Sequence, residues 1–219
     1  MRRMGFLSNA GTLQSAAMPA YPQTSALFDD WARQGRAEGM EAGHQPRALA
    51  GLEQVPVALG DAILDLGCGN GWATRWLRAA AGEGGSAVGL DAAPEMITRA
   101  TEASTGLHGL DFRVGAFGTL PWDDGSFQHA WSFEALYYAP DLDVALAEIH
   151  RVVTPGGTLT IGTDFYEEHE ESRGWPAMMG IPMELLSADG WQARLEGSGF
   201  AIEARFFSDV SLILRGRRT

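Results

Sequence analysis

The stretch that most constrains the fold of this chain is ILDLGCGNGW, residues 63–72. An apolar run leads into a turn that carries glycine at alternate positions, Gly67, Gly69 and Gly71. Glycine adopts left-handed backbone conformations and leaves room for another group to approach the main chain closely. The pattern therefore predicts a buried strand, a tight turn and a helix, with something lying directly against the turn.

Strand-like and helix-like segments alternate regularly from residue 61 onward. Such alternation is typical of an α/β fold in which parallel strands are joined by crossover helices. We expect a seven-stranded, mostly parallel sheet with helices on both faces, completed by a late hairpin that adds one C-terminal antiparallel strand. The expected strands are 62–66, 87–90, 111–114, 126–132, 158–162, 200–206 and 210–214, and the expected helices are 24–37, 46–52, 72–81, 94–103, 143–153 and 187–197.

The chain divides into three stretches in this interpretation. Residues 1–20 are expected to form a flexible N-terminal extension, residues 21–60 a helical cap and residues 61–219 the main domain. Within the main domain, residues 164–186 are irregular and rich in methionine, and they suggest a lid-like insertion. An ordinary surface loop packed by its own side chains is the alternative interpretation of this segment.

The glycine turn does not match a dinucleotide site. The dinucleotide fingerprint requires glycine at its first, third and sixth positions, and the sixth position counted from Gly67 is Trp72. Asp65 lies just before the turn, where a carboxylate opposes a pyrophosphate and favours a cation. Asp91 ends the second strand, at a spacing suited to ribose hydroxyls. A ligand with a ribose and a cationic group, but no phosphate, fits both carboxylates, and S-adenosylmethionine is such a ligand.

Several segments together resemble the class I S-adenosylmethionine-dependent methyltransferases, in particular the small-molecule type with a methyltransferase domain of the 11/25 kind. ILDLGCGNG looks like their first motif, and VGLDAAPEMI (88–97) looks like their second. The similarity continues through 112–127 and through 131–162, which includes a Pro-Gly-Gly turn before the fifth strand. The resemblance implies a Rossmann-like fold, S-adenosylmethionine as methyl donor and S-adenosylhomocysteine as product.

The resemblance also assigns cofactor-binding residues. The turn backbone would line the methionine part, with Asp65 near its ammonium group, and Asp91 would hold the ribose diol. The chain departs from many relatives at Ala116, where they carry an aspartate that accepts the adenine amine. Asp65 as a helix N-cap, and Asp91 as a cap of the helix that Pro94 opens, are the structural alternatives. The full implied set is Asp65, Gly67, Cys68, Gly69, Asn70, Gly71, Asp91, Ala92, Met96, Ala116, Phe117 and Phe133.

No catalytic residue can be assigned from the sequence, because methyl transfer requires a base only where the acceptor must lose a proton. The candidates for contact with the acceptor come from the cap and from the loops after the fourth and fifth strands. They are His44, Tyr137, Tyr138, Asp164 and Tyr166, with Glu134 beside them on the same loop as the tyrosines.

Composition limits the possible partners of the chain. Its formal net charge is −12, from 28 acidic and 16 basic residues, which disfavours nucleic acid and anionic membrane surfaces. The single cysteine excludes an internal disulfide, and the five histidines show no metal-ligand spacing, so we expect no metal. We expect a cytoplasmic monomer or homodimer that methylates a small molecule. A module that binds the cofactor without catalysis and, less favoured, an NAD-dependent oxidoreductase are the alternative functions.

Overall fold

The computed structural model describes residues 22–219, so the expected extension at residues 1–20 lies outside the described residues. The strands are β1 (Ala62–Leu66), β2 (Ser86–Asp91), β3 (Leu110–Val114), β4 (Phe127–Phe133), β5 (Val153–Thr163), β6 (Phe200–Ser208) and β7 (Ser211–Arg218). The α-helices are α1 (Pro22–Arg33), α2 (Arg36–Leu52), α3 (Trp72–Ala80), α4 (Pro94–Ala103), α5 (Leu142–Val152), α6 (Trp175–Met179) and α7 (Ala188–Gly197), and the 3-10 helices are η1 (Leu136–Tyr138) and η2 (Glu170–Gly174).

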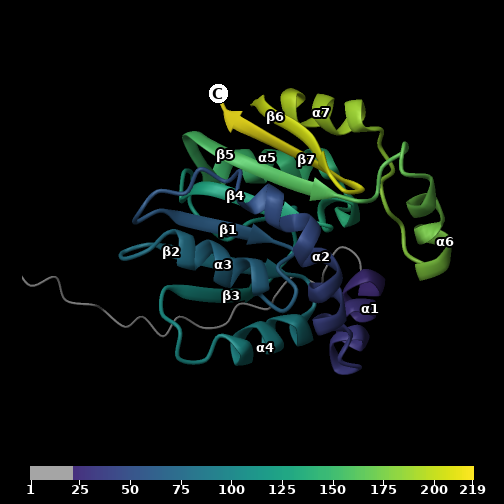
Figure 1. The fold of residues 1–219 in the computed structure, drawn as a ribbon, viewed down its shortest axis with the longest axis horizontal. Coiled ribbons are helices and arrows are strands. Elements are labelled where there is room, and N and C mark those ends of the chain that lie inside the picture. The colour runs from purple at the N-terminus through teal and green to yellow at the C-terminus, as the bar shows by residue number, and fades with distance from the viewer. Residues whose placement is uncertain (1–21) are drawn as a thin grey trace, which may run out of the picture.

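All seven strands form one sheet in the order β3-β2-β1-β4-β5-β7-β6 (Figure 1). Strand β1 pairs in parallel with β2 and β4, and the β2–β3 and β4–β5 pairs are parallel as well. Strand β7 is antiparallel to both of its neighbours, β5 and β6. The predicted fold class, including the C-terminal antiparallel strand, is confirmed.

Alternating side chains of the central strands enter two separate cores, because successive residues of a strand point to opposite faces. Ile63 and Trp131 pack with α2 and α3 on one face, whereas Leu64 and Ala130 pack with α5 and α7 on the other. Figure 1 shows the two helical layers and the cluster of α1, α2 and α4 at one end of the sheet. The central strands are therefore covered on both sides, as parallel strands generally are.

The N-terminal region differs from the prediction. Helix α2 runs through residues 38–45, which include Gly39 and Gly43 and were left between the expected helices 24–37 and 46–52, and Pro46 lies inside the helix rather than at its start. A proline removes one intrahelical hydrogen bond and clashes with the preceding turn. Burial of Ala48 and Leu52 against the sheet offsets this cost, since both side chains are fully buried.

Residues 164–186 are also more regular than expected, because η2 and α6 lie within them. Among residues 22–219, no helix combines the length and apolar character that a bilayer crossing requires. The sheet order reverses between β1 and β4, and in open α/β sheets the crevice at such a point, beyond the carboxyl ends of the strands, is where ligands bind. The loops that follow β1, β2 and β4 meet there, so a ligand-binding site is expected at this end of the sheet.

Candidate functional site

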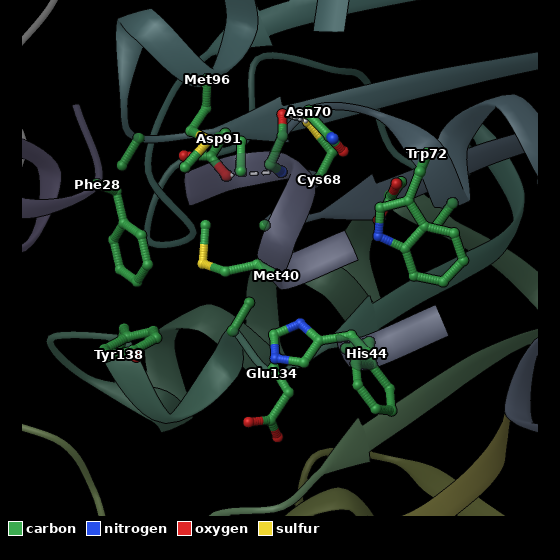
Figure 2. A pocket seen from close by; sticks show the side chains of 18 of the residues that line it. Phe28, Met40, His44, Cys68, Asn70, Trp72, Asp91, Met96, Glu134 and Tyr138 are labelled. Carbon is green, nitrogen blue, oxygen red and sulfur yellow. Dashed lines mark hydrogen bonds between the residues drawn. The ribbon is translucent and has the colours of Figure 1, made fainter. Parts of the chain in front are cut away.

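A pocket of about 1120 Å³, counted out to its open mouth, lies at this end of the sheet. The carboxyl ends of β1, β2 and β4 form one side, and α1 and α2 form the side that faces them (Figure 2). Its lining residues are Thr24, Phe28, Ala37, Met40, Glu41, His44, Asp65, Gly67, Cys68, Gly69, Asn70, Trp72, Ala73, Asp91, Ala92, Met96, Ala116, Phe117, Trp131, Phe133, Glu134, Ala135, Tyr138 and Pro140.

Most of the residues that the sequence singled out meet in this pocket. Every expected cofactor residue except Gly71 lines it, as do two of the acceptor candidates, His44 and Tyr138. The lining does not include the other three candidates, Tyr137, Asp164 and Tyr166. No lining residue comes from the segment 164–186.

The glycine turn is shaped by a close approach of two backbones. Gly67 has a φ of 75°, and a Cβ added to it would overlap the Cβ of Ala135, which follows β4. Gly69 also has a positive φ, 52°, but a Cβ there would meet no atom within 4 Å because it faces open space. Gly67 is thus required by the methyl group of Ala135, and Gly69 borders the space a ligand would fill.

Asp91 fixes the shape of this turn through its side chain. One carboxylate oxygen accepts a hydrogen bond from the backbone N–H of Gly69 at 2.9 Å (dashed in Figure 2), and the other accepts one from the backbone N–H of Ala93 at 2.9 Å. Burial raises the pKa of the Asp91 carboxyl, and the two backbone donors partly oppose that rise. Each oxygen keeps a lone pair for a further donor.

Asp65 is a buried carboxylate at the bottom of the pocket, with 2% of its surface exposed. The hydroxyl of Thr74, on α3, donates to it at 2.5 Å. Burial is the largest cause that raises the pKa of Asp65 to about 7, and the nearby charge of Asp91 adds to the rise. A cationic group placed beside Asp65 would therefore relieve an unfavourable buried charge.

Helices α1 and α2 supply the part of the lining that sequence reasoning largely missed. Glu41 accepts a hydrogen bond from the side-chain amide of Asn70 at 2.7 Å, which ties α2 to the glycine turn. The hydroxyl of Thr24 lines the pocket, is buried and has no hydrogen-bond partner within residues 22–219. Ala37, Met40, Glu41 and His44 follow the helical spacing of one face, so the signal was present in the sequence but was hidden by the assumption that this stretch is not helical.

Five residues form the side of the pocket opposite the glycine turn, which we call the opposite wall. Phe28 packs edge-on against the ring of Tyr138, with ring centroids 5.3 Å apart. The ring of His44 lies 5.7 Å from that of Phe133, and burial lowers the pKa of its imidazole. The members of the opposite wall are Phe28, Met40, His44, Glu134 and Tyr138 (Figure 2).

Glu134 belongs to a buried polar cluster beneath this wall. It has a φ of 56°, and its carboxylate accepts hydrogen bonds from the hydroxyl of Tyr137 at 3.0 Å and from the backbone N–H of Asp164. Asp164 in turn pairs with Arg47 of α2 at 2.7 Å and accepts a hydrogen bond from Ser211. Burial, followed by the charge of Asp164, raises the pKa of Glu134 to about 8.

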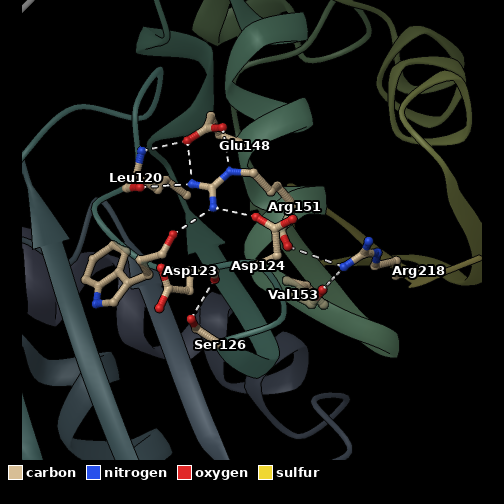
Figure 3. Close-up of polar contacts among 9 residues, drawn as sticks. Leu120, Asp123, Asp124, Ser126, Glu148, Arg151, Val153 and Arg218 are labelled. Carbon is tan, nitrogen blue, oxygen red and sulfur yellow. Dashed lines mark hydrogen bonds and ion pairs between the residues drawn. The ribbon is translucent and has the colours of Figure 1, made fainter.

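The connection from β3 to β4, which brings Ala116 and Phe117 into the pocket, is held by Arg151 of α5. The Arg151 guanidinium donates to the backbone carbonyls of Leu120 at 3.0 Å and of Trp122 at 2.7 Å (Figure 3). Glu148 accepts from the same guanidinium at 2.8 Å and from the N–H of Leu120 at 2.8 Å. The planar fork of arginine suits such a multiple contact.

The described part of the chain contains no side-chain arrangement suited to a metal ion and no reactive thiol. Among residues 22–219, no group of three or more His, Cys, Asp or Glu side chains is arranged to hold a metal ion. Cys68 is buried, and burial raises the pKa of its thiol well above the usual value.

Comparisons with known proteins agree with this geometry. A family model described as a methyltransferase domain matches residues 64–161. Malonyl-[acyl-carrier protein] O-methyltransferase of Erwinia billingiae is 34% identical over 177 residues, which cover 75% of this chain and 67% of that protein. The chain belongs to the class I S-adenosylmethionine-dependent methyltransferases.

Two further proteins are similar to this methyltransferase over most of its length. The 27-O-demethylrifamycin SV methyltransferase of Amycolatopsis mediterranei is 30% identical over 76% of this chain, which spans 62% of that protein's length. A methyltransferase chain solved in complex with the Haloferax volcanii Trm112 methyltransferase activator superimposes with a TM-score of 0.80 at 33% identity, over 87% of this chain and 96% of that chain.

The contrast between the two pocket glycines gives a first prediction. Both Gly67→Ala and Gly69→Ala place a side chain at positive φ, but only the first also overlaps Ala135. We expect Gly67→Ala to lower the free energy of unfolding by about 1–3 kcal/mol more than Gly69→Ala. Urea unfolding of the two variants measures the difference, and equal losses would contradict the close approach of the two backbones.

The buried Glu134 predicts a pH dependence of stability. Its folded-state pKa, about 8, lies above the ordinary value of 4.5, so the folded state holds a proton that the unfolded state has lost between these pH values. Its contribution is fully present below pH 4.5 and is lost as the pH rises through 8. We expect Glu134→Gln to flatten the fall in Tm between pH 5 and about 8.5. The surface variant Glu102→Gln is the control, and a Glu134→Gln profile parallel to the wild-type profile would show that the carboxyl does not titrate in this way.

Proposed function

We propose that this methyltransferase binds S-adenosylmethionine in the pocket and transfers the methyl group to a small-molecule acceptor. One observation supports this most strongly. Two buried or half-buried carboxylates, Asp65 and Asp91, flank a glycine turn, and no arginine or lysine occurs among the described residues that line the pocket. A cationic ligand without phosphate suits such a site better than a dinucleotide does.

The residues fit the cofactor at its methionine end. Asp65, whose buried carboxyl lacks a cationic partner among the described ion pairs, would hold the ammonium group. The open space in front of Gly69 would accommodate the methionine chain, beside Cys68 and Asn70. Asp65 also accepts a hydrogen bond from the side-chain hydroxyl of Thr74 on α3, but it is not the N-cap of the alternative interpretation, because the N-cap position of α3 is Gly71. The carboxylate has enough lone pairs to bind both Thr74 and an ammonium group.

The residues fit the ribose and adenine as well. Asp91 would accept hydrogen bonds from the ribose hydroxyls with the lone pairs that Gly69 and Ala93 leave free. The buried hydroxyl of Thr24, which has no hydrogen-bond partner among the residues that the structure describes, supports a polar ligand in this region. The adenine would be packed by residues that share an apolar or small side chain: Ala92, Met96, Ala116, Phe117 and Phe133.

The chemistry that S-adenosylmethionine supplies when bound is a methyl group on a good leaving group, a sulfonium. The protein's part is to position the acceptor and keep water out. Helices α1 and α2 (within the expected cap, residues 21–60) would cover the site, because they provide six of the lining residues: Thr24, Phe28, Ala37, Met40, Glu41 and His44. The main domain, residues 61–219, would hold the cofactor, and a lid-like role of residues 164–186 stays a prediction.

A small-molecule acceptor is supported by two lines of reasoning. The formal net charge of −12 opposes nucleic acid. The relative from Amycolatopsis mediterranei is named for a rifamycin, a small molecule. We propose a protein that works alone or as a homodimer on such an acceptor.

Calorimetry with S-adenosylhomocysteine tests the proposed function. We expect S-adenosylhomocysteine to bind far more tightly than NADH. We expect Asp91→Ala to lower the affinity for S-adenosylhomocysteine by about 10–100-fold, the scale of hydrogen bonds to a charged group. Asp111→Ala, which changes an exposed carboxylate paired with Arg113, is the matched control. Tighter binding of NADH, or an unchanged affinity in Asp91→Ala, would count against the proposal. Tight binding without methylation of any acceptor in a metabolite extract would favour a non-catalytic module.

Asp65 predicts a proton linkage of cofactor binding. Its pKa is about 7 in the free protein, and a bound ammonium would lower it, so binding below pH 7 should release a proton and affinity should rise from about pH 5 to 8. Calorimetry in two buffers of different ionisation enthalpy measures the proton. Asp65→Asn should abolish the proton release and weaken the binding of S-adenosylhomocysteine. It should not weaken the binding of 5′-methylthioadenosine, which has the ribose and lacks the ammonium group. Equal weakening of both ligands would place the ammonium elsewhere.

A further inference from the structure

The opposite wall carries information about the acceptor that the glycine turn does not. Figure 2 shows Phe28, Met40, His44 and Tyr138 facing the turn across the pocket. Two aromatic rings and a thioether make most of this surface apolar. An acceptor with an aromatic or other bulky apolar body would be packed well by it.

The electrostatics of the wall disfavour an anion. Arg47, the arginine nearest to it on α2, is already paired with Asp164 at 2.7 Å and does not line the pocket. Glu41 and Asp91 line the pocket and would repel a carboxylate or phosphate on the acceptor, and Asp65 would add to this repulsion in its ionised form. A buried anion with no partner is costly, so the wall selects against acceptors that carry one.

His44 is the group of the wall that can take a proton from an acceptor, because the hydroxyl of Tyr138, another polar group of the wall, has its pKa raised by burial and stays a neutral phenol. Both oxygens of Glu134 already accept hydrogen bonds, whereas the imidazole of His44 takes part in none of the side-chain hydrogen bonds within residues 22–219. Burial holds the pKa of the imidazole below its usual value, so that one ring nitrogen keeps a lone pair near neutral pH. A neutral imidazole facing an apolar pocket is suited to take a proton from a hydroxyl group.

We propose that the acceptor is an uncharged molecule with an aromatic or bulky apolar body and a hydroxyl group, and that His44 binds this hydroxyl and receives its proton. This rests on the proposed function. In the transfer, the acceptor oxygen forms a bond to the methyl carbon as the carbon–sulfur bond breaks with its electron pair left on sulfur. The hydroxyl proton passes to a ring nitrogen of His44 and then to solvent, which balances the reaction.

A series of small probes tests the charge selectivity in the unmodified protein. With S-adenosylhomocysteine bound, calorimetry compares 4-propylphenol with 3-(4-hydroxyphenyl)propanoate, which has the same phenol and an added carboxylate. We expect the neutral phenol to bind about 100-fold more tightly, because the carboxylate finds no cationic partner. Comparable affinities would overturn the uncharged class, and failure of both probes to bind would overturn the acceptor class as a whole.

The role of His44 is tested by removing the hydroxyl and the imidazole separately. In the wild-type protein, 4-propylphenol should bind about 3–10-fold more tightly than propylbenzene, and His44→Phe should abolish this ratio without weakening propylbenzene. His108→Phe, at an exposed loop position outside the pocket, is the matched control and should keep the ratio. A ratio that survives in His44→Phe would remove His44 from the site. If the wild-type protein does not bind S-adenosylhomocysteine at all, the proposed function itself is refuted. Failure of the acceptor proposal and failure of the proposed function can therefore be told apart.

Discussion

The site depends on one steric constraint, the approach of the backbone after β1 to the backbone after β4 at Gly67 and Ala135. Any side chain at Gly67 would separate the two loops at the point where the strand order reverses. The side chain of Asp91 then fixes the conformation that this contact permits, by accepting a hydrogen bond from Gly69. Three neighbouring strands, β2, β1 and β4, are thereby joined at their carboxyl ends, and the pocket is the space that remains above them.

A concentration of carboxylates follows from this geometry and carries an energetic cost. Asp65 and Glu134 are both buried, and burial raises the pKa of Asp65 to about 7 and that of Glu134 to about 8. A buried acid with a raised pKa makes the folded state less stable as the pH rises, so these groups do not serve stability near neutral pH. Strongly shifted acids in a pocket are typical of functional sites, where a ligand supplies the missing charge. The cost is therefore best understood as preparation for a cationic ligand at Asp65.

The sequence predicted the sheet well, and the residues expected to bind the cofactor lie together in one pocket except Gly71, because both are encoded locally. Strand β1 and helix α4 were predicted to the residue, since an apolar run before glycines, and a proline at a helix start, are short-range signals. The part of helix α2 before Pro46 was not predicted as helical because glycine and proline are poor helix formers, and only tertiary burial of Ala48 and Leu52 compensates. That error hid Met40 and Glu41, which reach the pocket only because the segment is helical.

The two halves of the pocket are built in different ways, and this explains why one is easier to interpret than the other. The half that would hold the cofactor is formed by the ends of paired strands, so hydrogen bonds of the sheet fix its residues. The opposite half depends on α2, which is joined to the sheet side by Asn70 with Glu41 and by Arg47 with Asp164. A few side-chain contacts can change without disturbing the sheet, so the helix surface can vary while the cofactor half stays intact. Specificity for the acceptor should therefore reside on the α2 stripe that includes Met40 and His44, and differences in acceptor among related methyltransferases should map to this helix rather than to the glycine turn.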